Sequence, residues 1–150
     1  MPFQDEIFDG GFMIHVGMNI EDKAQLFTEV YRVLRPGTLF GVYDIMRIGD
    51  GELTYPVPWA TVPSLSNLAT LEQYKQALSD AGFAVSTENN RRDFALGIYK
   101  QYAETTANGG PPLLGTHILM GESSAVKSKN LLENITAGHV APIEIIAQKY

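Results

Sequence analysis

The chain contains no cysteine among its 150 residues, so disulfide bonds, thiol nucleophiles and cysteine-ligated metals are excluded. It also lacks an excess of positive charge. The formal net charge is −6, which argues against nucleic acid or a membrane surface as a partner, because both are bound through basic patches. No apolar run approaches the ~20 residues of a membrane span, and the N-terminus has no basic-then-apolar signal pattern. We therefore expect a soluble, cytoplasmic protein.

What is present is typical of a globular domain. Hydrophobic residues make up 45% of the chain and charged residues 19%, which is ordinary for a soluble protein. At this length we expect a single domain over residues 1–150, able to bury roughly 70% of the surface of its unfolded form. His117 and His139 are isolated, without a second ligand at a useful spacing, so we expect no metal site.

The most informative stretch is residues 34–44, LRPGTLFGVYD. Pro36-Gly37 is a breaker pair that ends a helix and turns the chain. Residues 39–43 form an apolar run that is too short for a globular helix and rich in strand formers. A strand that is apolar on both faces suits the interior of a parallel sheet. Asp44 would end this strand at the carboxyl edge, where open α/β sheets place their ligands.

A second short strand is predicted over Phe12–Val16, before an amphipathic helix over residues 21–34. Asn19 is a candidate cap for this helix, with Asp22 as its capping-box partner. Strand, helix and the strand at 39–43 would form one right-handed crossover and therefore a parallel pair.

The long segment 45–66 is irregular and contains Tyr55 and the only tryptophan, Trp59. Loops of this length in compact domains are usually lids or binding loops. After it, Thr70 and Gln73 form a capping box for a helix that Gly82 ends. The remaining predictions are a strand at 83–88, a helix at 93–106 packed through Phe94, Ile98, Tyr99 and Tyr102, a loop or short turn at 113–121, a helix from Ser124, and a last strand at 141–149.

The order of these elements is that of a known protein family. The segments that carry the resemblance are residues 2–9 (PFQDEIFD), the strand to His15, the turn at 32–37 (RVLRPG) and the helix closed by 81–83 (AGF). Together they resemble the second half of a class I S-adenosylmethionine-dependent methyltransferase, over most of residues 1–100. The resemblance implies an α/β class: an incomplete Rossmann-like fold with a mostly parallel sheet, a C-terminal antiparallel strand and flanking helices. It also implies methyl transfer from S-adenosylmethionine to a small-molecule acceptor, which it does not identify.

In that family the cofactor is held largely by the first half of the fold, through a glycine-rich loop and an acid that binds the ribose. This chain has no strand–glycine loop–helix unit, because Gly10-Gly11, Gly49–Gly51 and Gly109-Gly110 lie in turns with other flanks. We therefore interpret it as a fragment, a truncated gene product or a relic. We expect weak or no binding of S-adenosylmethionine by the isolated chain, and no catalytic residue is identified. The alternative to an enzyme part is a non-catalytic remnant or association module.

The resemblance implies cofactor contacts for His15 and Val16 at the strand end, although a histidine satisfied by a backbone carbonyl is the structural alternative. Asn19 either caps a helix or binds the acceptor. Tyr43 and Asp44 are acceptor candidates, and Asp44 would orient the acceptor or act as a base, or else cap a turn.

Tyr55 and Trp59 would form an aromatic lid over the acceptor that excludes water, or else a satellite hydrophobic cluster under the long loop. Arg91-Arg92 is interpreted as a solvated pair at a helix start rather than an anion site.

One edge of the predicted sheet has no neighbour. In the complete fold the strand Phe12–Val16 pairs on both sides, with the first strand of the cofactor half as one partner. Its residues carry no charge, proline or bulge signal that would blunt an open edge. We therefore expect a homodimer whose interface includes residues 8–20, with a dimer through the C-terminal strands as the alternative.

Overall fold

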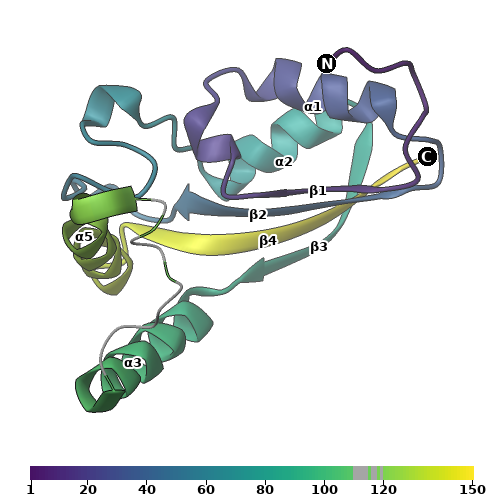
Figure 1. Ribbon diagram of the computed structural model, residues 1–150. Helices are drawn as coiled ribbons and strands as arrows, with labels where there is room; N and C mark the ends of the chain where they lie inside the picture. The colour runs from purple at the N-terminus through teal and green to yellow at the C-terminus, as the bar shows by residue number, and fades with distance from the viewer. Residues whose placement is uncertain (110–114, 116–117, 119) are drawn as a thin grey trace.

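The computed structural model describes residues 1–109, 115, 118 and 120–150. A four-stranded sheet is combined with helices that lie on both of its faces (Figure 1). In chain order the elements are β1 (Gly11–Ile14), α1 (Lys23–Val33), β2 (Leu39–Arg47), α2 (Leu71–Asp80), β3 (Phe83–Asn90), α3 (Arg92–Gly109), α5 (Ser124–Thr136) and β4 (Val140–Lys149). Short 3-10 turns lie at Gly17–Asn19, Pro63–Leu65 and Gly121–Ser123.

The strand order in the sheet is β1-β2-β4-β3. β1 and β2 are parallel, as the predicted crossover requires, with Met13 opposite Val42. β4 is antiparallel to both β2 and β3. The α/β class is therefore confirmed, but the sheet is mixed rather than mostly parallel. The antiparallel strand β4 lies inside the sheet instead of at its edge, so it accounts for two of the three strand pairs.

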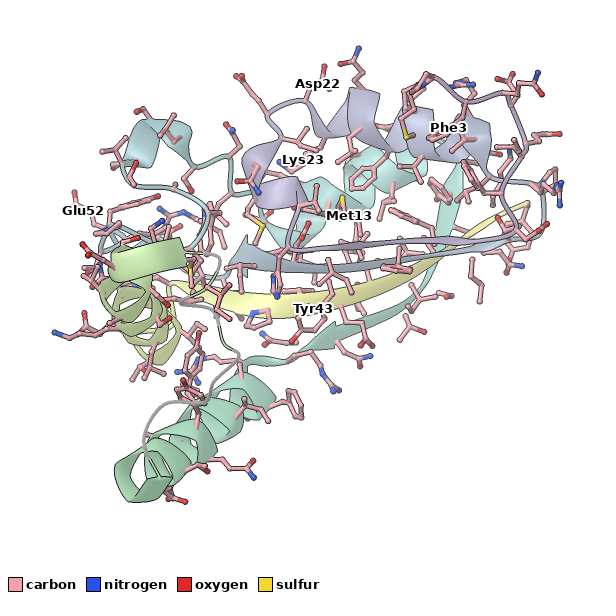
Figure 2. The ribbon with its side chains drawn as sticks, viewed as in Figure 1. Phe3, Met13, Asp22, Lys23, Tyr43 and Glu52 are labelled. Atoms are coloured by element: carbon pink, nitrogen blue, oxygen red, sulfur yellow. The ribbon has the colours of Figure 1, made fainter. Side chains whose placement is uncertain are left out.

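Helices α1 and α2 cover one face of the sheet (Figure 1). The main core lies between them and the strands, where the Phe40 ring stacks on Phe83 at 5.7 Å and meets Phe27 edge-on at 6.3 Å between centroids. Figure 2 shows Met13 turned toward these helices and Tyr43 on the opposite face. Burial of these apolar side chains is the main source of the stability of this layer.

The opposite face of the sheet is open over much of its length, because α3 and α5 reach only the end of the sheet where β2 finishes (Figure 1). Phe12, Ile14 and Leu39 project from this face and are 78%, 53% and 53% exposed. β1 is also an edge strand, with β2 as its only partner among the described residues. The molecule therefore presents an apolar sheet face next to an unpaired strand edge.

The helix ends show which capping predictions were correct. The Thr70–Gln73 capping box is confirmed, with reciprocal bonds of 3.2 and 2.8 Å, and Gly82 ends the helix with φ +104°. The prediction that Asn19 caps the first helix is wrong. Asp22 is the cap and accepts a hydrogen bond from the Gln25 amide at 2.8 Å, because a 3-10 turn occupies Gly17–Asn19 before the helix begins.

Two further predictions need correction. β2 runs to Arg47, three residues beyond Asp44, because it pairs with β4 along its whole length. In α3, Phe94, Ile98 and Tyr102 are at least 50% exposed, and only Tyr99 of the predicted packing residues joins a core cluster, together with Leu96. His117 and most of the segment 113–121 lie outside the described residues.

No helix in the described part of the chain is long and apolar enough to cross a membrane. Within the same residues, no group of three or more histidine, aspartate or glutamate side chains is placed to hold a metal ion.

Candidate functional site

A cavity of about 520 Å³ opens where β1 and β2 end, and this volume is in the range of small-molecule pockets. The segment after β1, strand β2, the long loop, α3, α5 and the residue before the last 3-10 turn all contribute to its wall. The lining residues are His15, Met18, Asn19, Ile45, Pro58, Trp59, Tyr99, Met120, Ser128 and Leu131.

A second hollow of about 230 Å³ adjoins this cavity along the open face of the sheet. It shares His15, Ile45, Tyr99 and Leu131 with the larger cavity. Its own lining residues are Tyr43, Phe94, Ala95, Ile98, Ile135 and Pro142. His15 and Tyr99 therefore stand at the junction of the two spaces, with apolar side chains on either side.

Asp44 lies on the other side of β2 and is fully buried. Its Oδ1 accepts a hydrogen bond from the Val16 amide at 2.9 Å, and its Oδ2 accepts from the Gly17 amide and the Tyr74 hydroxyl, both at 3.0 Å. Hydrogen bonds to a carboxylate are stronger than those between neutral groups. Asp44 therefore holds the backbone that follows β1 in place.

The fit around Asp44 requires glycine at position 17. A Cβ atom there would lie 2.3 Å from both Asp44 Oδ2 and the Tyr74 hydroxyl oxygen. Burial and the neighbouring Asp44 charge both raise the pKa of Tyr74, so the phenol stays protonated and donates its hydrogen bond. Lys23 lies over the Tyr74 ring at 5.6 Å and donates to the backbone carbonyls of Ile20 and Asn67. Burial lowers its pKa, and Asp44 partly opposes this effect.

His15 adopts a left-handed backbone conformation, with φ +54°. Its amide donates to the Tyr43 carbonyl at 2.9 Å, and its ring meets the Tyr43 ring edge-on with centroids 5.4 Å apart. Part of the His15 side chain is exposed to solvent. Its partial burial nevertheless lowers the pKa of His15 below 6.5, and the Asp44 charge opposes this shift without reversing it. The imidazole is therefore largely neutral at pH 7, and within the described residues its ring nitrogens have no hydrogen-bond partner.

The long loop is anchored on α5 by two buried asparagines. The Asn134 side chain accepts from the Thr54 amide at 2.9 Å and donates to the Thr54 carbonyl at 3.0 Å. Asn130 donates to the Pro56 carbonyl at 2.9 Å. A few residues further on, Trp59 is half-buried in the cavity wall, and its indole N–H donates to the Ser66 hydroxyl at 2.9 Å.

The structure brings together four of the residues that the sequence marked as site candidates. His15, Asn19 and Trp59 line the larger cavity, and Tyr43 lines the adjoining hollow. Their roles toward a cofactor or an acceptor stay predictions.

Val16, Asp44 and Tyr55 line neither space. Tyr43 and Asp44 are separated because consecutive residues of a strand point to opposite faces. Val16 contributes its amide to Asp44 and leaves its side chain exposed. Tyr55 is half-buried in the anchored part of the loop.

Most of the lining residues were not identified from the sequence. They are Met18, Ile45, Pro58, Tyr99, Met120, Ser128 and Leu131. Tyr99 was assigned to helix packing, which is correct for part of its surface. The available signal was the number of aromatic and aliphatic residues at 94–102, which is more than one face of a helix can bury.

Comparison with known proteins gives matches in both sequence and fold. Residues 1–42 match a family model described as a methyltransferase domain. "Sterol methyltransferase-like 1" of Botryococcus braunii is 48% identical over 44 residues, which cover 29% of this chain and 11% of that protein. Cycloartenol-C-24-methyltransferase 1 of Oryza sativa subsp. japonica is 29% identical over 104 residues, covering 57% of this chain and 26% of the relative.

Among solved structures, the fold is similar to that of geranyl diphosphate C-methyltransferase from Streptomyces coelicolor A3(2), with a TM-score of 0.71 and 17% identity. That alignment covers 100% of this chain and 50% of the other. The chain thus spans about half the length of this structure, and its matches span about a quarter or less of the two curated relatives.

Proposed function

We propose that the chain is part of a class I S-adenosylmethionine-dependent methyltransferase and forms the acceptor-binding half of its methyl-transfer site. Residues 1–42 match a methyltransferase-domain model, and the fold is similar to about half of a solved methyltransferase. The glycine-rich half of the fold, in a longer parent chain or on a separate one, would complete that site. The observation that carries this proposal is the position of the cavity at the end of β1 and β2, where open α/β sheets bind their ligands.

We propose that the described residues do not bind the cofactor without the glycine-rich half. Asp44 is fully buried and accepts hydrogen bonds from three donors, so its carboxylate is not free to bind a ribose. His15 lines the cavity just after β1, and the neighbouring Val16 amide is held by Asp44; a cofactor contact of these two residues in the completed fold remains our proposal. The function of this half is therefore to bind and orient the acceptor and to exclude water from it.

We expect the long loop and the helices α3 and α5 to exclude water from the cavity. Pro58 and Trp59 of the long loop, Tyr99 of α3 and Leu131 of α5 all line the same cavity as Ile45. Methyl transfer needs an acceptor atom that is aligned with the methyl group, so a cavity of fixed shape serves the reaction without many charged side chains.

An association module is the second candidate function, and the exposed Phe12, Ile14 and Leu39 favour it. Apolar patches of this kind mark interfaces. When the glycine-rich half is absent, we propose that the open edge near Phe12–Val16 pairs with the same edge of a second copy.

Mixing the chain with the separately expressed glycine-rich half of a related methyltransferase tests the enzymatic proposal. Transfer of a labelled methyl group from S-adenosylmethionine to an added acceptor is expected only when both halves are present. A variant with Phe12→Lys, on the exposed sheet face, serves as the control and should lower the yield of the complex. If the halves form a complex that binds S-adenosylmethionine but transfers no methyl group to any acceptor offered, the proposal is wrong.

A further inference from the structure

The cavity wall carries information about the kind of acceptor. None of its lining residues among those the structure describes has a permanently charged side chain. Most of the wall is aliphatic or aromatic, and its polar groups are the neutral side chains of His15, Asn19, Tyr99 and Ser128. The adjoining hollow has the same character, with Tyr43 as its further polar residue.

The nearby charged groups already have partners. Asp44 binds two amides and a phenol, and Lys23 donates to two backbone carbonyls. Arg92 donates to the last carbonyls of α5, at Ile135 and Thr136, over 2.8 and 2.9 Å. None of these three side chains lines the cavity or the hollow. A phosphate, carboxylate or ammonium group bound in the cavity would therefore lose its hydration without gaining a counter-charge, which is strongly unfavourable.

Arg91 is a further cation close to the smaller hollow. Its guanidinium lies over the Phe94 ring at 4.9 Å, and its Nε is buried without a hydrogen-bond partner in the described part of the chain. Phe94 lines the smaller hollow, whereas Arg91 lines neither space. Burial raises the pKa of Tyr43, which lines the same hollow, and the Arg91 charge partly opposes this rise. Arg91→Ala is therefore a necessary variant in the binding experiment.

The neutral polar groups are available for a ligand. The ring nitrogens of His15 and the hydroxyls of Tyr99 and Ser128 make no hydrogen bond to other described residues. Burial raises the pKa of Tyr99 and lowers that of His15, so both side chains are uncharged near pH 7. A hydroxyl can donate to the imidazole, and either a hydroxyl or a carbonyl can accept from the phenol or the serine.

We propose that the acceptor is an uncharged, largely apolar molecule with one hydroxyl or carbonyl group. Its apolar body would lie between Trp59 and Leu131, and its polar group would face His15, Tyr99 and Ser128. This inference rests on the proposed function, because it takes the cavity to be the acceptor site. It excludes diphosphates, phosphorylated amines and zwitterionic amino acids as acceptors.

Trp59 is the only tryptophan of the chain and lines the cavity, so its fluorescence reports on occupancy. The probes are farnesol and farnesyl diphosphate, which share the same apolar chain and differ in charge, each kept below its aggregation concentration. We expect a saturable change with farnesol and binding of the diphosphate that is at least about tenfold weaker. Equilibrium dialysis of the same pair measures binding independently of the fluorescence.

Matched variants place a charge inside and outside the cavity. Ser128→Lys puts an ammonium group into the wall and should weaken farnesol binding while strengthening diphosphate binding. Ala125→Lys adds the same charge at an exposed position of α5 that lines neither space and should change neither. Circular dichroism checks that both variants fold.

Two results would overturn the inference. One is diphosphate binding as tight as farnesol binding, particularly if Arg91→Ala abolishes it. The other is the absence of saturable farnesol binding by both fluorescence and dialysis. The titration needs no cofactor, so it is independent of the test of methyl transfer. Preferred binding of the charged probe would contradict only this inference, whereas failure of the completed enzyme to transfer a methyl group to any acceptor offered would contradict the proposed function.

Discussion

Asp44 was identified from its place in the sequence as an acceptor contact or a turn cap, and the structure places it beneath the site. Its carboxylate connects β2, the backbone after β1 and α2 through three hydrogen bonds. That arrangement fixes where His15 stands, because His15 directly precedes the two amides that Asp44 holds. Asp44 is therefore a positioning residue in this structure.

Replacing Asp44 with asparagine should destabilise the fold. Asparagine keeps one acceptor oxygen but turns an NH2 group toward the donors, so we expect a loss of about 1.5–3 kcal/mol in the free energy of unfolding, measured with urea. The control variant Tyr74→Phe removes one of the three bonds and should cost about 1 kcal/mol. An unchanged midpoint for Asp44→Asn would show that these bonds contribute nothing.

His15 should give the stability a specific pH dependence. Its folded-state pKa lies below the ordinary value of 6.5, so the unfolded chain binds a proton first as the pH falls. The contribution of neutral His15 to the free energy of unfolding is thus fully present above pH 6.5 and is lost as the pH falls below it. NMR titration should find a pKa under 6.5 for this histidine, and a still lower one in Asp44→Asn, because the charge that raises it is gone. The variant His15→Asn, which tolerates a positive φ, should lose stability less steeply between pH 7.5 and 5.5. If the free energy of unfolding falls equally steeply with pH in the wild type and in His15→Asn, the pH dependence does not come from His15.

Among the elements, the long loop depends on α5. Residues 54–56 are not part of the sheet, and their backbone groups are hydrogen-bonded instead by two asparagines one helical turn apart, Asn130 and Asn134. These contacts hold the loop segment that leads to Trp59 against α5, the helix that carries Leu131. Trp59 and Leu131 both line the cavity.

Removing the side chain of Asn134 should loosen this wall. Asn134→Ala deletes two hydrogen bonds and leaves the Thr54 amide and carbonyl without partners, so we expect a loss of about 1–3 kcal/mol. Trp59 should become more accessible to acrylamide, and its emission should shift to the red. Asn130→Ala deletes one bond and should have a smaller effect on both readouts. Quenching that stays the same in Asn134→Ala would show that the loop is held by other contacts.

Local patterns predicted the elements better than they predicted the site. The Thr70–Gln73 box, the turn at Pro36-Gly37 and the stop at Gly82 depend on neighbouring residues, and each is present. The cap of the first helix lies three residues later than predicted, because Asn19 and Asp22 are both good caps and only the turn at Gly17–Asn19 decides between them. The cavity joins residues as distant as Met18 and Leu131, so no local pattern contains it.

At the scale of the whole molecule, the open sheet face and the edge of β1 are the features that distinguish this chain from a complete fold. The helices α1 and α2 cover one face of the sheet, whereas the apolar side chains of Phe12, Ile14 and Leu39 are exposed on the other face. Such a surface is expected to be covered by a second polypeptide segment.

Sedimentation of the isolated chain should therefore detect a dimer at micromolar concentration, with the amides of residues 12–16 protected from hydrogen exchange. Phe12→Lys places a charge on the open face and should shift the equilibrium toward the monomer. Leu65→Lys, at an exposed position of the long loop outside β1 and β2, should leave the dimer intact. A stable monomer in which the Ile14 amide exchanges freely would refute the dimer.

The central claim is that this chain holds the acceptor side of a methyltransferase and needs the glycine-rich half to bind the cofactor. Calorimetric titration of S-adenosylmethionine into the isolated chain, and into its complex with that half from a relative, tests this claim most directly. We predict no saturable heat for the isolated chain and clear binding by the complex. Low-micromolar affinity of the isolated chain would contradict the account, because the residues around His15 would then suffice.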